Sequence, residues 1–175
     1  LEECYDVEAE FKGRTLRMDL NFEGNSIDTK RLAVVKKFIE GLEKFDVQNK
    51  KCIEEDYADE DCDTIRTYVE HHLEEIENDE LAAIVDFGNK SIEPEVQLLN
   101  ALHLVRVGIY PDLEDQFATF DYSIDEELTQ YLVVIFTNHK GEMDYMTMVR
   151  KLILLFSKHQ IELLILYMVL IWQVY

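Results

Sequence analysis

Positively charged residues are scarce in this sequence, in which 17 Lys and Arg residues stand against 37 Asp and Glu residues. The resulting net charge of −20 repels the phosphates of nucleic acids and of anionic membranes. We therefore expect no nucleic acid as a partner and, for residues 1–148, no membrane. The same charge favours a basic protein as partner.

Cysteine, proline and glycine are also rare, with three, two and six residues. The cysteines form no C-x-x-C pair, which favours a reducing compartment, the cytoplasm, and argues against a zinc or redox site. No linker rich in proline or glycine divides the chain, so residues 1–148 are expected to form one domain. The sequence contains no G-x-S-x-G, P-loop, G-x-G-x-x-G or H-E-x-x-H motif. We predict neither a cofactor nor a catalytic residue.

The first half of the chain reads as a hairpin followed by helices. Apolar and polar residues alternate from Val7 to Phe22 with a turn at 12–14, which predicts two strands. Ser26 offers a helix cap, and helical spacing follows from about Asp28 to Phe45. One stripe of this helix contains Leu32, Val35, Ile39 and Leu42 and is expected to be buried. Three shorter helices are expected at 47–57, 63–77 and 79–87, and a last helical turn or two from Pro94.

A period of two residues then replaces the helical spacing. It predicts four strands joined by short turns, at 102–110, 116–124, 130–137 and 143–148. The predicted fold class is α+β: an N-terminal β-hairpin, a block of three to five short helices, and a four-stranded antiparallel meander.

The last 27 residues differ in character from the rest. Residues 149–175 carry a net charge of +2 and are almost wholly apolar, whereas residues 1–148 carry −22. The apolar run at 163–172 is about half of the ~20 residues that a membrane-spanning helix needs, and extending it would bury Lys158 and Glu162. Three interpretations stay open for this extension: a segment on a membrane surface, a segment that docks a partner, or the product of a frame slip or read-through.

His71 and His72 are weak candidates for metal ligands. Adjacent residues on a helix diverge by about 100°, so the two imidazoles cannot both bind one ion. His72 shares a stripe with Tyr68 and Val69, which places it at the edge of the core. His71 is expected beside Glu74 on the other side of the helix.

The acidic run at 54–63 is a weak candidate for calcium. Asp59, Asp61 and Asp63 have the spacing of the first three ligands of an EF-hand loop. Glu70 falls at the twelfth position, but the sixth position needs glycine and holds Thr64. A solvated acidic connection, with Asp61 or Asp63 as a helix cap, explains the run better.

Arg106 is a lone cation among the apolar residues of its expected strand. Two interpretations are open: Arg106 holds an acidic side chain such as Asp121 across the sheet, in a polar or ligand site, or it points from an exposed face. Gly108, in the same strand, indicates a bulge or a close approach of another group to the backbone.

Several segments of residues 1–148 resemble a known family in the same order along the chain. They are RMDLNFEGNSID (17–28), TYVEHHLEEI (67–76), VRVGIYPD (105–112) and FDYSIDEELTQYLVV (120–134). In these segments the chain resembles the bacterial domain-of-unknown-function family numbered two thousand and four. Members of that family end near the strand at 144–148, so the resemblance implies that residues 149–175 are an addition. The family has no established activity, and no site residue follows from it.

Acidic charge without a catalytic motif favours a protein that acts by binding, the cysteine pattern favours the cytoplasm, and the resemblance implies a bacterial source. We predict a non-catalytic protein-binding module, immunity-like or regulatory, whose charge matches a basic partner. The alternative is a small-ligand-binding protein or an enzyme of unknown reaction that uses a cleft between sheet and helices.

Overall fold

The computed structural model describes residues 2, 4–24 and 26–151. Strands and helices follow in the order β1 (Cys4–Phe11), β2 (Arg14–Asn21), α1 (Thr29–Glu40), α2 (Leu42–Ala58), α3 (Thr64–Glu75), α4 (Asn78–Leu81), α5 (Pro94–Ala101), β3 (His103–Ile109), β4 (Ala118–Ser123), β5 (Tyr131–Thr137) and β6 (Met143–Arg150). An α+β fold with an N-terminal hairpin and central helices is therefore confirmed. No helix in this part of the chain is both long and apolar enough to cross a membrane. β6 includes Val149 and Arg150, and the predictions made for 152–175 lie outside the described residues.

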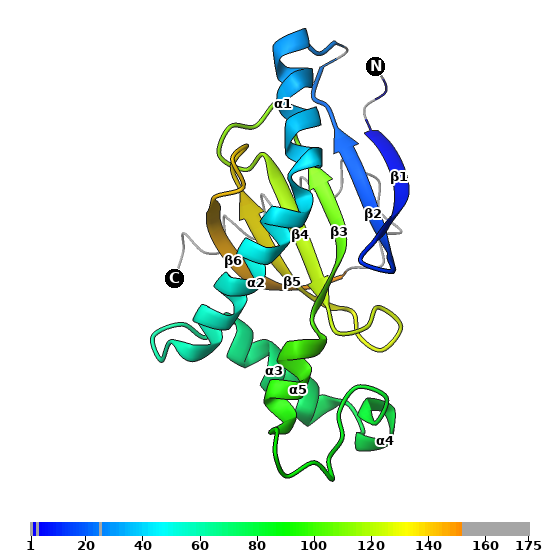
Figure 1. The fold of residues 1–175 in the computed structure, drawn as a ribbon, viewed down its shortest axis with the longest axis vertical. Coiled ribbons are helices and arrows are strands. Elements are labelled where there is room, and N and C mark those ends of the chain that lie inside the picture. Colours follow the sequence, from blue (N-terminus) through cyan, green and yellow to red (C-terminus); the bar gives the residue numbers. More distant parts are fainter. Residues whose placement is uncertain (1, 3, 25, 152–175) are drawn as a thin grey trace, which may run out of the picture.

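One sheet contains the six strands of the described residues, in the order β1-β2-β3-β4-β5-β6 (Figure 1). The prediction of a four-stranded sheet was wrong, because the hairpin joins the meander. β2 pairs parallel to β3, with Met18 opposite Val107, whereas the other neighbouring pairs are antiparallel. Parallel neighbours need a long crossover connection, and the helical block between β2 and β3 supplies it.

Local sequence explains how α1 begins. The side chain of Asp28 accepts hydrogen bonds from the N–H groups of Lys30 and Arg31, at 2.8 and 2.9 Å. These bonds satisfy N–H groups that have no partner inside the helix. The cap is therefore Asp28, and the prediction of Ser26 was wrong.

Two helices differ in length from the expectation. The helical pattern from Asp28 to Phe45 is interrupted at Gly41, where α1 ends and α2 begins. Glycine weakens a helix interior because its backbone loses the most conformational entropy on folding. The helix expected at 79–87 is only the four-residue α4, which turns follow.

Helices α1 and α2 lie across one face of the sheet (Figure 1) and supply part of the core. Phe38 is 1% exposed, and its ring centroid lies 5.1 Å from that of Phe117 and 6.0 Å from that of Phe120. Leu32 and Ile39, expected on the buried stripe, are instead 50% and 40% exposed. The buried positions of these two helices include Val35, Phe38, Leu42 and Phe45.

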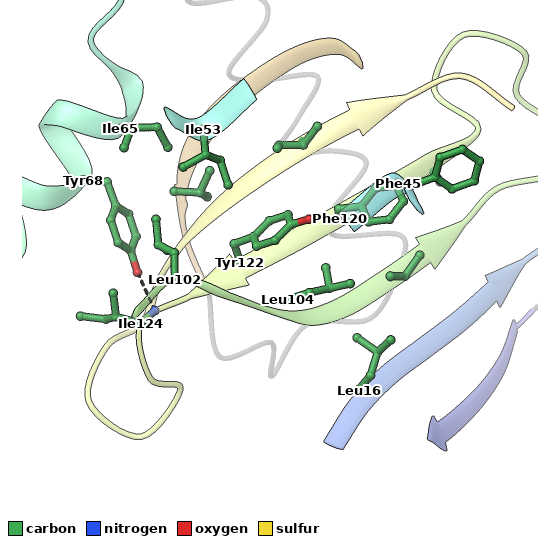
Figure 2. Packing of buried hydrophobic residues seen from close by; sticks show 14 of the residues in the cluster. Leu16, Phe45, Ile53, Ile65, Tyr68, Leu102, Leu104, Phe120, Tyr122 and Ile124 are labelled. Carbon is green, nitrogen blue, oxygen red and sulfur yellow. Dashed lines mark hydrogen bonds between the residues drawn. The ribbon is translucent and has the colours of Figure 1, made fainter. Parts of the chain in front are cut away.

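Tyr68 extends the core from α3 toward the end of β4 (Figure 2). Its ring is fully buried, and its hydroxyl oxygen accepts a hydrogen bond from the N–H of Ile124 at 3.3 Å. Burial raises the pKa of Tyr68 to about 12. Leu16 and Tyr122 belong to the same cluster, so β2, β4 and α3 share one core. Burying each such apolar side chain contributes about 1.5–3 kcal/mol.

Candidate functional site

Arg106 lies at the centre of an ionic cluster that joins three strands. Its Nε and Nη2 atoms donate to Asp19 Oδ1 and Oδ2 at 2.6 and 2.8 Å, and its Nη1 donates to Asp121 Oδ2 at 2.9 Å. Asp19 comes from β2, Arg106 from β3 and Asp121 from β4. The three side chains are 29%, 10% and 9% exposed, in the order Arg106, Asp19, Asp121. Charges buried to this degree are stable only when they are paired and hydrogen-bonded.

The guanidinium of Arg106 has little capacity left for a ligand. Burial lowers the pKa of Arg106, but the neighbouring Asp121 and Asp19 carboxylates outweigh burial and raise it. Burial also raises the pKa of Asp121, an effect that Arg106 partly offsets. Two carboxylates around one guanidinium leave a net negative charge, which disfavours an anionic ligand. The cluster acts as a clamp between strands, and a ligand role for Arg106 and Asp121 stays a prediction.

Gly108 makes room for this cluster. A Cβ atom at Gly108 would lie 2.8 Å from Arg106 Nη2 and 2.8 Å from Thr119 Oγ1. Real Cβ atoms do not approach other atoms so closely, so the position accepts glycine alone without rearrangement. Of the two interpretations of Gly108, the close approach applies, while the register shift of β3 lies earlier, between Leu104 and Arg106.

The two histidines of α3 have different surroundings. His72 is fully buried. Its Nδ1 lies 2.6 Å from the carbonyl oxygen of Tyr68, so Nδ1 carries the proton, and its Nε2 accepts from Thr129 Oγ1 at 2.7 Å. Burial lowers the pKa of His72. The ring of His71 instead packs edge-on against Tyr131, with centroids 4.3 Å apart.

The acidic run connects α2 to α3, and Asp side chains hold it by accepting hydrogen bonds from backbone N–H groups. Asp59 ends α2, and its Oδ1 accepts from the N–H of Asp61 at 3.0 Å. Asp63 precedes α3 without capping it through its side chain, and Asp56 instead accepts from the N–H of Ile65 at 2.8 Å. Across the described residues, no three His, Cys, Asp or Glu side chains gather as metal ligands. The weak metal candidates are therefore not assembled into such a site: Asp59, Asp61, Asp63, Glu70, His71 and His72.

The segment from the end of α2 through α3 to α4 is strongly acidic, and we call its exposed side chains the acidic helical surface (residues 54–80). It contains thirteen Asp and Glu residues and one cation, Arg66. All of these carboxylate residues are exposed except Asp56, which is half-buried. Glu55 bonds to Lys51 at 3.0 Å, and no other carboxylate of this surface has a described cationic side chain within 4 Å. The surface therefore carries a large uncompensated negative charge.

An apolar patch follows this surface in the chain. Phe87, Ile92 and Val96 are 43%, 42% and 37% exposed. Gln97 of α5 holds the segment in place, because its side chain donates to the Asp86 and Ile92 carbonyl oxygens at 3.1 and 2.9 Å. The side-chain oxygen of Gln97 also accepts from the N–H of Asp86 at 2.8 Å. Figure 1 shows that α4, α5 and the segment between them lie at the same end of the molecule as α3.

Sequence reasoning missed both Asp19 and the apolar patch. Asp19 shares one face of β2 with Arg17, opposite to Met18 and Leu20, so alternation could have placed it on the face of the sheet that is not the core. Its distance from Arg106 depends on the β2–β3 pairing, which no local pattern contains. The apolar patch was not predicted because its segment was expected to be partly helical.

Comparisons with known proteins gave no match to this chain: no protein family, no curated protein and no solved structure resembles it significantly. The resemblance to the uncharacterised bacterial family stays a prediction. Function is therefore inferred from the contacts, charges and exposed surfaces of the described residues.

Proposed function

We propose that this protein is a non-catalytic binding module whose acidic helical surface receives a basic protein. The observation that carries the proposal is the uncompensated charge of residues 54–80, which have thirteen carboxylates and one arginine. Like charges gathered in one region of the molecule raise the potential there and steer a cationic partner toward it.

The apolar patch gives such a partner an anchor. Charged rims alone contribute little affinity, because exposed ion pairs are worth about 0–1 kcal/mol each. Interfaces gain most of their free energy from a few buried anchors, among which aromatic residues are common. Phe87 is the aromatic residue of the patch, and it is 43% exposed. We infer that Phe87 is buried in the complex and that the carboxylates surround it.

The experiment is capture of partners on the immobilised full chain from cells that express it, with wild type and variants side by side. The first variant is E74Q/E77Q/E80Q, which removes three exposed charges that have no described ion-pair partner. Capture of a basic protein by wild type and about tenfold or greater weakening by this variant are the expected results. The complex should also dissociate as salt is raised, because exposed charges are screened.

A charge-matched control separates local binding from general attraction. The variant D6N/E8Q/E10Q removes the same number of exposed carboxylates from β1, at the edge of the sheet. We expect this control to bind as wild type does. Equal weakening by both variants would show that net charge alone attracts the partner, and the proposed surface would then be wrong.

The anchor is tested separately with Phe87→Ala and the control Leu32→Ala. Leu32 is an exposed apolar residue of α1, at 50% exposure, outside the acidic helical surface. Loss of a central aromatic anchor is expected to weaken binding by about thirtyfold or more, whereas the control should leave binding unchanged. Unchanged binding by Phe87→Ala would refute the anchor.

We also propose a cytoplasmic, bacterial setting for this role. The low cysteine content supports a reducing compartment, and neither Cys52 nor Cys62 forms a disulfide. The resemblance to the bacterial family of unknown function supports the source and an immunity-like or regulatory role. Mass-spectrometric mapping of disulfides in protein purified under alkylating conditions tests the compartment, since a native Cys52 or Cys62 disulfide would contradict it.

A further inference from the structure

Three cations gather in one small pocket, although acids outnumber cations by more than two to one in the chain. The pocket has a volume of about 250 Å³ and lies between the β1–β2 turn, α2 and the junction of α5 with β3. Its lining includes Lys12, Arg14 and Lys50, together with His103 and one acid, Asp46. This pocket, which we call the basic pocket, is separate from the acidic helical surface.

The acid of the basic pocket is already neutralised. Asp46 is 1% exposed, and its Oδ2 lies 2.7 Å from Lys12 Nζ. Its Oδ1 accepts a hydrogen bond from the Tyr122 hydroxyl at 3.0 Å. Arg14 and Lys50 have no carboxylate within 4 Å among the described residues, so the pocket keeps two uncompensated positive charges.

His103 holds Arg14 at the pocket. Nδ1 of His103 lies 3.0 Å from the carbonyl oxygen of Ala101, which can only accept, so Nδ1 carries the proton. Nε2 therefore presents its lone pair and accepts from Arg14 Nη1 at 3.2 Å. The other N–H groups of Arg14 make no hydrogen bond within the described part of the chain, so they can donate to a ligand.

We propose that the basic pocket binds the phosphoryl group of a small phosphomonoester. A phosphate dianion matches the two uncompensated charges, and the planar guanidinium of Arg14 can donate two parallel hydrogen bonds to its oxygens. Lys50 supplies the second charge, and His103 is a positioning residue that acts through Arg14. The groups that oppose an anion here include Asp46, the carbonyl end of α5 and Asp125, whose charge acts on His103. Asp46 is bonded to Lys12, and the Ala101 carbonyl accepts from His103.

Calorimetric titration of the full chain at low salt tests the proposal, with glycerol 3-phosphate, inorganic phosphate and malonate as probes. We expect both phosphates to bind and malonate to bind more weakly than either. A tighter glycerol 3-phosphate shows that the ester group is recognised too, whereas equal binding assigns the site to the phosphoryl group alone. No binding of either phosphate at millimolar concentration, or tighter binding of malonate, would overturn the proposal.

Variants locate the binding. Arg14→Met and Lys50→Met are each expected to weaken phosphate binding about tenfold or more, because each removes a charge-assisted contact. Lys44→Met is the matched control, since Lys44 is an exposed cation of the same helix as Lys50 but does not line the pocket. Arg14 is exposed and outside the core, so its variant should fold even if the Lys50 variant does not. Phosphate affinity that Arg14→Met leaves unchanged would refute the site.

Discussion

The buried cluster of Arg106 with Asp19 and Asp121 makes the most exacting prediction about stability. Replacing Arg106 by Met keeps most of the side-chain volume but removes the shared partner of both carboxylates. Asp19 and Asp121 are 10% and 9% exposed, so water cannot take over the role of the guanidinium. Breaking a buried ion pair in this way costs about 3–5 kcal/mol. That is a large part of the roughly 5–15 kcal/mol by which a typical domain is stable.

Two further measurements separate the charge effect from a packing effect. The triple variant R106M/D19L/D121L removes the orphaned carboxylates and should recover most of the lost stability, because an apolar replacement of a buried ionic cluster is often neutral. Val134, which pairs with Asp121 in the sheet, is itself buried in an apolar cluster beside this position. In R106M the unpaired carboxylates should have a raised pKa, so their protonation stabilises the folded state as the pH falls. The deficit relative to wild type should therefore be largest at neutral pH and shrink toward pH ~4.

Urea unfolding followed by circular dichroism, with linear extrapolation to water, measures these free energies. A loss below about 1 kcal/mol for R106M, or a deficit independent of pH, would show that the carboxylates do not depend on Arg106. Failure of the triple variant to recover stability would assign the loss to packing around the side chain.

Two other predictions concern glycine and histidine. Gly13 and Gly141 both have positive φ, at 77° and 75°, but a Cβ at Gly13 would meet nothing within 4 Å whereas one at Gly141 would overlap the ring of Phe45. We expect Gly13→Ala to lower the free energy of unfolding by about 1–2 kcal/mol through backbone strain alone, and Gly141→Ala to lower it by about 1–3 kcal/mol more. Equal urea midpoints for the two variants would contradict this. Burial lowers the pKa of His72 and of His103, so the unfolded chain takes up protons before the folded chain does as the pH falls. The free energy of unfolding should therefore fall below pH ~6.5, by up to about 1.4 kcal/mol per pH unit from the fully buried His72. A constant free energy of unfolding between pH 7.5 and about 5.5, measured by urea titration, would refute the neutral state of the buried His72 ring.

The period-two strands were the part of the fold that the sequence could predict. The strands expected at 102–110, 116–124 and 130–137 agree with β3, β4 and β5 to within two residues at each end. Alternation encodes which side of a strand is buried, and short turns between strands force antiparallel neighbours. The β2–β3 pairing lay beyond this reasoning, because its residues are separated by the whole helical block. The predicted number of strands was therefore right, but the prediction divided one sheet into a separate hairpin and meander.

The helices were less predictable for a similar reason. Leu32 and Ile39 have helical spacing and are exposed, because burial depends on where the sheet lies and not on the pattern alone. Gly41 divides the expected long helix. The low helix propensity of glycine indicates a weak point there, but a single glycine in a sequence does not show that a helix ends.

The candidate sites show the same division between local and distant information. The contact of Arg106 with Asp121 could be anticipated because their strands are joined by one turn. Asp19 and the basic pocket could not, since Arg14 and His103 are 89 positions apart in the chain. When the neighbour of a strand is unknown, the distance from a charged residue on that strand to other charges cannot be inferred. Only the tertiary structure could therefore show that these groups lie together.

The central claim is that the acidic helical surface and the apolar patch form one binding face. Hydrogen–deuterium exchange of the full chain, alone and with the captured basic protein, tests it most directly. We expect slower exchange in the presence of that protein across residues 59–63 and 77–93, with β1 unchanged. Protection confined to β1 or to other elements outside 54–96 would contradict the claim.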